Sequence, residues 1–217
     1  WNKSEVKSMI NELLDYYATN FSYIAEQFSR HFLIAIYGVL FACILGIPLG
    51  FFVAGREKIR NIVIAVVNVI QTIPGLAMLA ILMMLIGIGA NTVVLSVFLY
   101  ALLPIIKNTI TGIDAIDPGI IDAAQGMGMT PVQQVINVEL PLSISVIMGG
   151  IRNALVVGIG VAAIGTFIGA GGLGDIITRG TVVANGSAII LAGAIPTALM
   201  AIVSDLVLGQ IEKKLKQ

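Results

Sequence analysis

Five long stretches of apolar residues dominate the pattern along this chain. They cover residues 32–54, 62–88, 92–113, 142–168 and 188–211. A helix needs about 20 mostly apolar residues to cross the hydrocarbon core of a bilayer, so each stretch is long enough for one crossing. The pattern therefore predicts an all-α polytopic membrane protein with about five transmembrane helices.

The composition supports the same class. Hydrophobic residues make up 58% of the chain and charged residues 11%, whereas soluble domains carry about 25% charged residues. The formal net charge is zero, which gives no reason to expect a nucleic-acid partner. The single cysteine, Cys43, and the single histidine, His31, cannot form a disulfide or a metal site. We expect Cys43 to be a small buried residue and His31 to lie at the membrane interface.

The basic residues predict the orientation in the membrane. Seven of the 12 basic residues follow the first or fifth stretch or lie near the end of the third: Arg56, Lys58, Arg60, Lys107, Lys213, Lys214 and Lys216. Five crossings place all seven on one side, and an excess of Lys and Arg marks the cytoplasmic side. Lys3, Lys7, Arg30 and Arg179 are a minority expected on the other side. We therefore expect the N-terminus outside and the C-terminus inside. Residues 1–30 mix charged, apolar and aromatic residues and predict an extracytoplasmic amphipathic or peripheral segment, followed by a transmembrane domain over 31–217.

The second stretch contains a helix-breaking pair, Pro74-Gly75. It is either one kinked span or two short helices. Non-helical backbone at membrane depth is tolerated only where it is buried in protein or lines a cavity. The same region carries polar side chains, so we take it as a candidate translocation path, together with an aromatic residue of the third stretch: Asn68, Gln71, Thr72, Pro74 and Tyr100.

Two charged residues lie within the later stretches. For Arg152 we favour a place at the membrane interface over a functional role inside the fourth span, although burying such a group in lipid is costly. Asp205, in the fifth stretch, either pairs with a basic residue or is solvated.

Residues 114–141 are too polar for lipid and contain two helix starts. Asp117 can cap a helix that begins at Pro118. Thr130 precedes a second proline and can form a capping box with Gln133. Gly126 and Gly128 lie between them. The segment therefore predicts two short helices at the cytoplasmic surface.

The spacing in this loop resembles that of ABC importer permeases, whose loop motif reads Glu-Ala-Ala, three residues, Gly, nine residues, Ile, one residue, Leu-Pro. Here the matching residues are Asp122-Ala123-Ala124, Gly128, Val138 and Leu140-Pro141, with Asp for Glu and Val for Ile. The resemblance implies a type I importer permease fold. It also implies a loop that docks on a cytoplasmic ATPase subunit through Asp117, Asp122, Ala123, Ala124, Gly128, Thr130, Leu140 and Pro141.

Further segments are similar to one branch of these permeases, the importers of osmoprotectants such as glycine betaine, carnitine and choline. The segments are 71–75, 100–109, 126–130, 141–142 with 147–152, and 167–175. The resemblance implies a multi-pass permease of a prokaryotic cell membrane that works as a homo- or heterodimer. It also implies an extracytoplasmic substrate-binding protein or fused domain, and it makes the chain either a stand-alone permease or the membrane domain of such a fusion.

The glycines of the Gly169-x-Gly171-Gly172-x-Gly174 segment match a dinucleotide-binding fingerprint. That site needs a preceding strand and an acidic residue about 20 positions on, whereas the preceding run is long enough to cross a membrane and no acidic residue lies between Asp175 and Asp205. We expect an outward-facing connection instead.

The sequence has no P-loop, so the chain is not itself the ATPase. No set of catalytic residues converges either, so we do not expect an enzyme. We expect no cofactor in it, because ATP and Mg²⁺ would be used by the partner ATPase. The alternative is an ion-coupled secondary transporter, which normally has intramembrane ionisable residues and an internal repeat.

Overall fold

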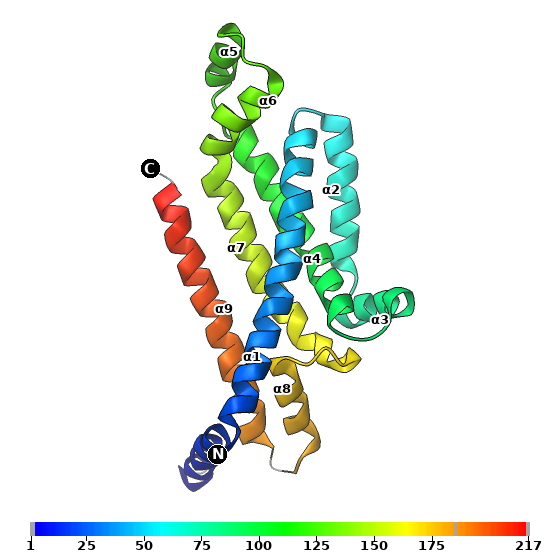
Figure 1. Cartoon of the computed structure of the whole chain (residues 1–217), viewed down its shortest axis with the longest axis vertical. Helices are drawn as coiled ribbons and strands as arrows, with labels where there is room; N and C mark the ends of the chain where they lie inside the picture. Colours follow the sequence, from blue (N-terminus) through cyan, green and yellow to red (C-terminus); the bar gives the residue numbers. More distant parts are fainter. Residues whose placement is uncertain (1–2, 185, 216–217) are drawn as a thin grey trace. The chain divides into compact units, whose positions relative to one another are not determined.

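The structure, a computed structural model, describes residues 3–184 and 186–215 (Figure 1). Lys216, one of the basic residues behind the predicted orientation, lies outside the described residues. All regular secondary structure in the described part is helical, which confirms the all-α prediction. The elements are α1 (Lys3–Ala54), α2 (Glu57–Thr72), α3 (Gly75–Ile86), α4 (Ala90–Asp114), α5 (Pro118–Gly126), α6 (Pro131–Gln134), the π-helix η1 (Val135–Glu139), α7 (Leu140–Ile164), the 3-10 helix η2 (Gly165–Ile168), α8 (Leu173–Val182) and α9 (Ser187–Leu215).

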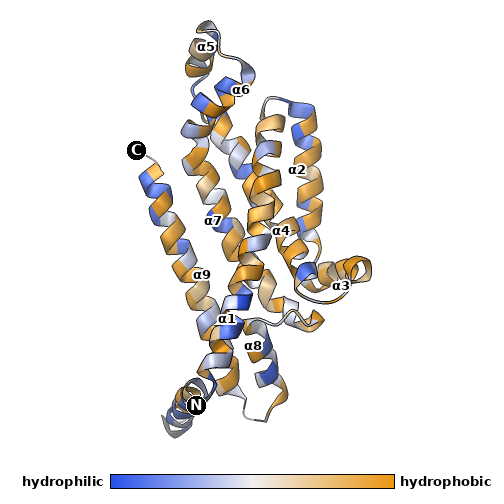
Figure 2. Ribbon diagram, viewed as in Figure 1, coloured by the Kyte–Doolittle hydropathy of each residue, from blue (hydrophilic) through white to orange (hydrophobic). Residues whose placement is uncertain are grey.

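Four helical segments in the described residues are long and apolar enough to cross a membrane. They lie within α1, α4, the run 131–168 and α9. The pair α2 and α3 makes a fifth if it is counted as one broken span. Figure 2 shows these helices as predominantly hydrophobic, with hydrophilic residues on α6 and near the C-terminal end of α9. The predicted number of about five spans is therefore confirmed.

The second stretch consists of two helices. Between them, Ile73 and Pro74 have extended ψ angles of 124° and 140°. Proline disfavours the helical conformation in the residue before it and lacks the N–H that would continue the ladder. The α3 ladder then starts with a bond from the Met78 N–H to the Pro74 oxygen, at 2.9 Å. Of the two alternatives that the sequence leaves open, one kinked span or two short helices, the structure shows two helices.

The loop over 114–141 differs from its prediction at the second helix. α5 is a separate short helix, but α6 passes through η1 directly into α7. A proline inside a regular α-helix clashes with the carbonyl four residues earlier. For Pro141 that residue is Asn137, which lies within η1, where the wider π-turn relieves the clash. The predicted second helix is therefore the first part of a longer continuous helix.

The N-terminal segment and the connection over 169–187 both contain helix. α1 begins at Lys3 and continues through the segment predicted as peripheral, leaving helical geometry only at Asn20 (φ −115°, ψ 19°). The predicted connection over 169–187 contains the helix α8. Cys43 is half-buried rather than buried.

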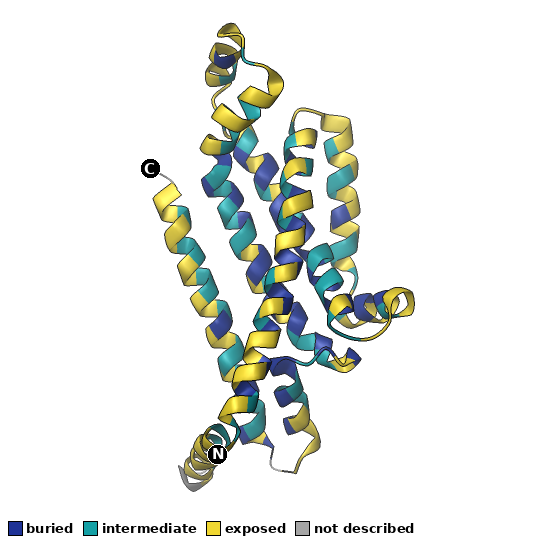
Figure 3. Cartoon of the chain, viewed as in Figure 1, coloured by how far each residue is buried: buried dark blue, intermediate teal, exposed yellow. Residues whose placement is uncertain are grey.

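The chain forms two compact units, and α1, α4, α7 and α9 each contribute to both. The first comprises Trp1–Gly38, Pro74–Val97 and Val157–Val203. Its core includes Ile159, Leu173 and Ile176, which are fully buried. Figure 3 shows buried residues along α8.

The second unit comprises Val39–Ile73, Phe98–Val156 and Ser204–Gln217. Its core includes Ile105, Ile106 and Ile147. Small residues bring its helices close together: a Cβ at Gly50 would lie 2.6 Å from the Thr109 side chain. This agrees with the packing role of small residues in membrane helices.

Candidate functional site

The first helix of the 114–141 loop has a cap at each end. At its start, the Asp117 carboxylate accepts a hydrogen bond from the Gly119 N–H at 2.7 Å. At its end, the Gly128 N–H donates to the Gln125 oxygen (2.9 Å) and the Met129 N–H to the Ala124 oxygen (3.2 Å). This pair of bonds, with a left-handed glycine, is a Schellman motif. Gly128 has φ +77°, which explains why a glycine stands there.

The start of α6 carries the predicted capping box. The Thr130 N–H donates to the Gln133 side-chain oxygen at 2.8 Å, and the Gln133 N–H donates to the Thr130 hydroxyl at 3.4 Å. These reciprocal bonds satisfy backbone donors that a helix start leaves without partners. The turn between α5 and α6 is therefore fixed by local bonds on both sides.

The residues of the loop motif that resembles Glu-Ala-Ala and Leu-Pro differ in how far their side chains are exposed. Ala124 is buried, while Asp122, Ala123 and Pro141 are exposed and Leu140 is half-buried. The same loop exposes large apolar side chains: Met127 is 71% exposed and Val132 67%. Exposed apolar groups on an otherwise polar segment are typical of an interaction surface.

A cavity of about 460 Å³ lies between this loop and the turn that joins α1 to α2. Its lining includes Phe51, Arg56, Gln134 and Glu139. The start of α2, directly after this turn, is tied to the loop, because Arg60 forms an ion pair with Asp114 at 2.9 Å. The turn and the loop therefore form one surface within the second unit.

The residues predicted to line the translocation path fall into two groups. Gln71 donates to the Tyr100 backbone oxygen at 2.9 Å, and the Tyr100 hydroxyl donates to the Ile73 backbone oxygen. These two residues hold the end of α2 against α4. Asn68 and Thr72 lie one turn apart on an exposed face of α2, and Pro74 is exposed as the cap of α3. The structure thus brings Gln71 and Tyr100 together and leaves Asn68 and Thr72 on the surface of the chain.

The glycine segment over 169–174 forms a tight connection into α8. Gly169, Gly171 and Gly172 have positive φ angles of 73°, 72° and 87°. Gly174 lies in α8, where a Cβ would be 2.0 Å from the Ala163 backbone oxygen. The close approach of α8 to α7 therefore requires a glycine at this position.

Two side chains of α1 hold this connection in place. The Gln27 side-chain oxygen accepts from the Gly172 N–H at 2.7 Å. His31 Nδ1 accepts from the Leu173 N–H at 3.2 Å, and its Nε2 lies 2.9 Å from the Ile159 oxygen. Because Nδ1 is an acceptor, the proton of the neutral ring resides on Nε2. His31 is fully buried, so its expected place at the membrane interface is wrong.

The same face of α1 carries a third contact with α8. The Tyr23 hydroxyl donates to Asp175 at 2.5 Å, and Asp175 pairs with Arg179 at 2.9 Å. Sequence analysis missed this set. The available signal was the spacing of Tyr23, Gln27 and His31, because residues four apart share one face of a helix.

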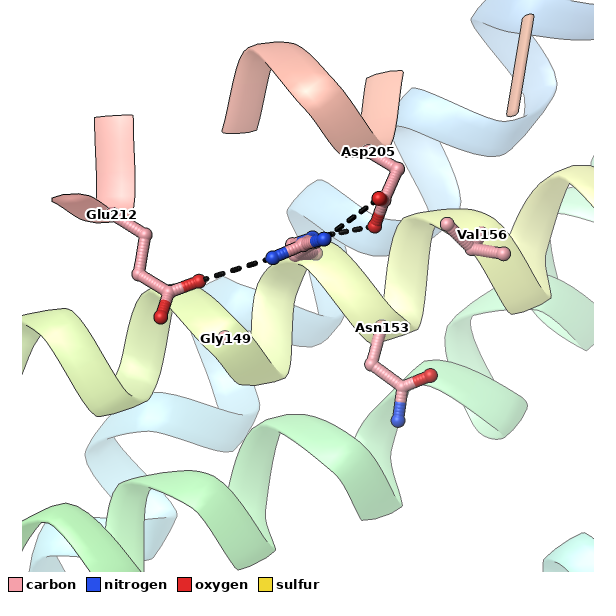
Figure 4. Close-up of a pocket in the computed structure, with 6 residues that line it drawn as sticks. Gly149, Asn153, Val156, Asp205 and Glu212 are labelled. Carbon is pink, nitrogen blue, oxygen red and sulfur yellow. Dashed lines mark hydrogen bonds and ion pairs between the residues drawn. The ribbon is translucent and has the colours of Figure 1, made fainter. Parts of the chain in front are cut away.

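Arg152 forms a charged cluster with α9 (Figure 4). Its Nε lies 2.5 Å from Asp205 Oδ1 and its Nη2 2.7 Å from Asp205 Oδ2. Its Nη1 lies 3.5 Å from Glu212 Oε2. Of the two alternatives for Asp205, the structure shows pairing. Arg152 is likewise paired with protein groups, and its side chain is 37% exposed, which is compatible with the expected place at the membrane interface.

Residues 46–217 match the family described as "Binding-protein-dependent transport system inner membrane component". The carnitine transport permease protein OpuCD of Listeria monocytogenes is 60% identical over 206 residues, covering 95% of this chain and 92% of that protein.

Two permeases of one Bacillus subtilis system, named for glycine betaine, carnitine and choline transport, also match. OpuCD is 58% identical, over 95% of this chain and 90% of that protein. OpuCB is 37% identical, over 94% of both. Among solved structures, an inward-facing form of the MetNI methionine ABC transporter has a TM-score of 0.80 at 21% identity. The match covers 89% of this chain and 96% of that one. At this identity the likeness shows a shared fold.

Proposed function

This chain belongs to the family of binding-protein-dependent transport system inner membrane components and is the permease subunit of an ABC importer, and we propose that it carries betaine-type quaternary ammonium solutes. It is a multi-pass protein of a prokaryotic cell membrane. It is not an enzyme, because ATP hydrolysis lies with partner subunits in this family. The ion-coupled alternative is not supported by its relatives or by its fold.

The substrate proposal rests on the relatives that are more than half identical to this chain. Their names specify carnitine, glycine betaine and choline. These solutes share a quaternary ammonium group, which aromatic side chains commonly bind. Aromatic residues make up only 6% of this chain. We therefore assign most of the recognition to an extracytoplasmic substrate-binding protein or fused domain, which would deliver the solute to the outward segments.

The loop from 114 to 141 is the proposed contact with the ATPase. The observation that carries this proposal is the combination of a rigidly capped turn with exposed apolar side chains, Met127 and Val132 among them. A rigid loop loses little conformational entropy on binding and transmits movement well. The loop and the C-terminus would lie in the cytoplasm and the N-terminus outside. ATP and Mg²⁺ would bind the ATPase.

We propose that a second, different permease completes the translocation path. One Bacillus subtilis system name covers two permeases, and this chain is 58% identical to one and 37% identical to the other. A chain so much nearer to one member would pair with a counterpart of the other. The exposed Asn68 and Thr72 of α2 are the residues we expect to face the path.

The proposal is tested in proteoliposomes that hold this chain, the second permease and the ATPase. ATP hydrolysis is measured with binding protein that is empty or loaded with carnitine, glycine betaine or choline. Loaded binding protein should stimulate hydrolysis. Ala123→Glu should abolish the stimulation without unfolding the chain, because Ala123 is exposed. Ala124→Glu is unsuitable for this purpose, because Ala124 is buried.

Lys214→Gln serves as the control, since it changes an exposed charge on α9 and should leave stimulation intact. Solute transport driven by an ion gradient, with no binding of the ATPase by the unmodified chain, would show the proposal to be wrong.

A further inference from the structure

The ion pairs between α7 and α9 are unequal. Asp205 accepts two bonds from the Arg152 guanidinium, at 2.5 and 2.7 Å, whereas Glu212 accepts one at 3.5 Å. Paired bonds from arginine to a carboxylate are stronger and more directional than a single contact. Figure 4 shows the guanidinium lying between the two carboxylates. Arg152 is therefore bound more firmly to Asp205 than to Glu212.

The fold leaves room for this guanidinium. A Cβ at Gly209 would lie 3.2 Å from Arg152 Nη1 and 3.3 Å from its Cζ. Beside the cluster is a cavity of about 290 Å³, which Asn153 and Val156 also line. The space would allow the arginine side chain to change its position without displacing a packed neighbour.

Arg152 is the only charged residue of α7 (Leu140–Ile164). A charged side chain inside a spanning helix is costly and is by default a functional candidate. α7 is also the continuation of α6 through η1, with no break in the helical run from 131 to 168. Any axial movement of the 114–141 loop, called the coupling loop below because it is the proposed contact with the ATPase, would therefore be passed to Arg152.

The two acidic partners lie on one face of α9, seven residues apart. Seven residues are about two turns and about 10 Å along a helix. The Arg152 guanidinium already lies within reach of both carboxylates, so a slide of α7 along α9 by much less than this distance would strengthen its contact with one carboxylate and weaken its contact with the other. Discrete jumps between alternative partners are a known way for packed helices to have two stable arrangements.

We propose that Arg152 is a positioning residue of the transport cycle that ties α9 to the helix driven by the coupling loop. In the structure described here the Arg152 guanidinium is held by Asp205. After α7 has moved along α9, the guanidinium is held by Glu212 instead. This inference rests on the proposed function, because it requires that the loop be moved by an ATPase.

The test uses the complete reconstituted importer and measures solute imported per ATP hydrolysed, together with the melting temperature of the complex. Asp205→Asn should lower the ratio several-fold, because without this ion pair a movement of α7 is no longer passed to α9. Glu212→Gln should leave the ratio unchanged but slow both import and hydrolysis. Without Glu212 no second carboxylate competes with Asp205 for the guanidinium, so α7 leaves its present position more slowly. Arg152→Gln should uncouple in the same way as Asp205→Asn.

Asn153→Ala is the matched control: Asn153 lines the same cavity without taking part in the ion pairs, and its variant should keep the ratio and both rates. The inference is overturned if Asp205→Asn and Glu212→Gln change the ratio equally, or if both only lower the melting temperature. A fall in activity for Asn153→Ala as large as that for Asp205→Asn would also overturn it. Failure of the unmodified importer to respond to binding protein would instead count against the proposed function.

Discussion

Replacing Gly128 by alanine tests whether the turn between α5 and α6 must be preformed. Gly128 has φ +77° and closes the Schellman motif of α5. An added Cβ would meet no atom within 4 Å, so the substitution causes no clash. Its cost comes from the backbone alone and is about 1–2 kcal/mol for an L-residue in the left-handed region. A cost of this size lowers the population of the native turn by about 5- to 30-fold relative to its alternatives.

The expected consequence is weaker docking of the ATPase. When only a fraction of molecules has the binding-competent conformation, the apparent Kd rises by the inverse of that fraction. We therefore expect Gly128→Ala to raise the Kd of the ATPase for the reconstituted permease, by up to about 30-fold where the turn is the limiting element. The measurement is a titration of ATPase onto permease in nanodiscs, with stimulated hydrolysis followed in parallel.

Two further substitutions separate backbone strain from the mere addition of a side chain. Gly126 ends α5 without a positive φ, and its added Cβ also meets nothing within 4 Å. Gly126→Ala should therefore leave docking unchanged, and alanine is favoured over glycine in a helix by about 1 kcal/mol. Gly128→Asn should recover part of the affinity, because asparagine tolerates the left-handed region. Equal effects of Gly126→Ala and Gly128→Ala would refute the reasoning, as would no recovery with asparagine.

Three other substitutions are expected to have measurable effects on the melting temperature in detergent. His31→Ala leaves two buried backbone groups without their bonds at about 1–3 kcal/mol each, and His31→Asn should restore only the acceptor toward α8. Gly174→Ala should lower the melting temperature strongly, because its Cβ would overlap a backbone oxygen, while Gly160→Ala, with nothing within 4 Å, should not lower it. Tyr100→Phe should cost about 1 kcal/mol for the lost hydroxyl bond and slow transport by loosening the end of α2; unchanged transport would contradict that role.

The features predicted correctly from the sequence are those that depend on nearby residues. Both loop caps are local, since Asp117 bonds two residues away and Thr130 three. The number of spans depends on runs of apolar residues, each of which is contiguous in the chain. Such signals need no knowledge of the neighbouring helices, so periodicity and capping chemistry suffice.

The features that were missed depend on which helices meet. His31 was assigned to the interface because it lies at the edge of an apolar stretch, yet it bonds residues 128 and 142 positions away. The continuity of α6 with α7 was missed for another reason. Polar composition indicates that a segment leaves the lipid, but it does not indicate that the helix stops there, and the helix continues through a π-turn.

The charged and polar residues of this chain share a pattern that sequence reasoning could use more fully. Tyr23, Gln27 and His31 repeat at four residues on α1, and Asp205 and Glu212 repeat at seven on α9. Both spacings return to one face of a helix. In an apolar helix, a face with two or more polar groups must find polar partners, because lipid supplies none. On α1 these partners are the glycine connection and α8, and on α9 the partner is Arg152. The repeat therefore indicates that a helix has a partner on that face, and only the fold identifies the partner.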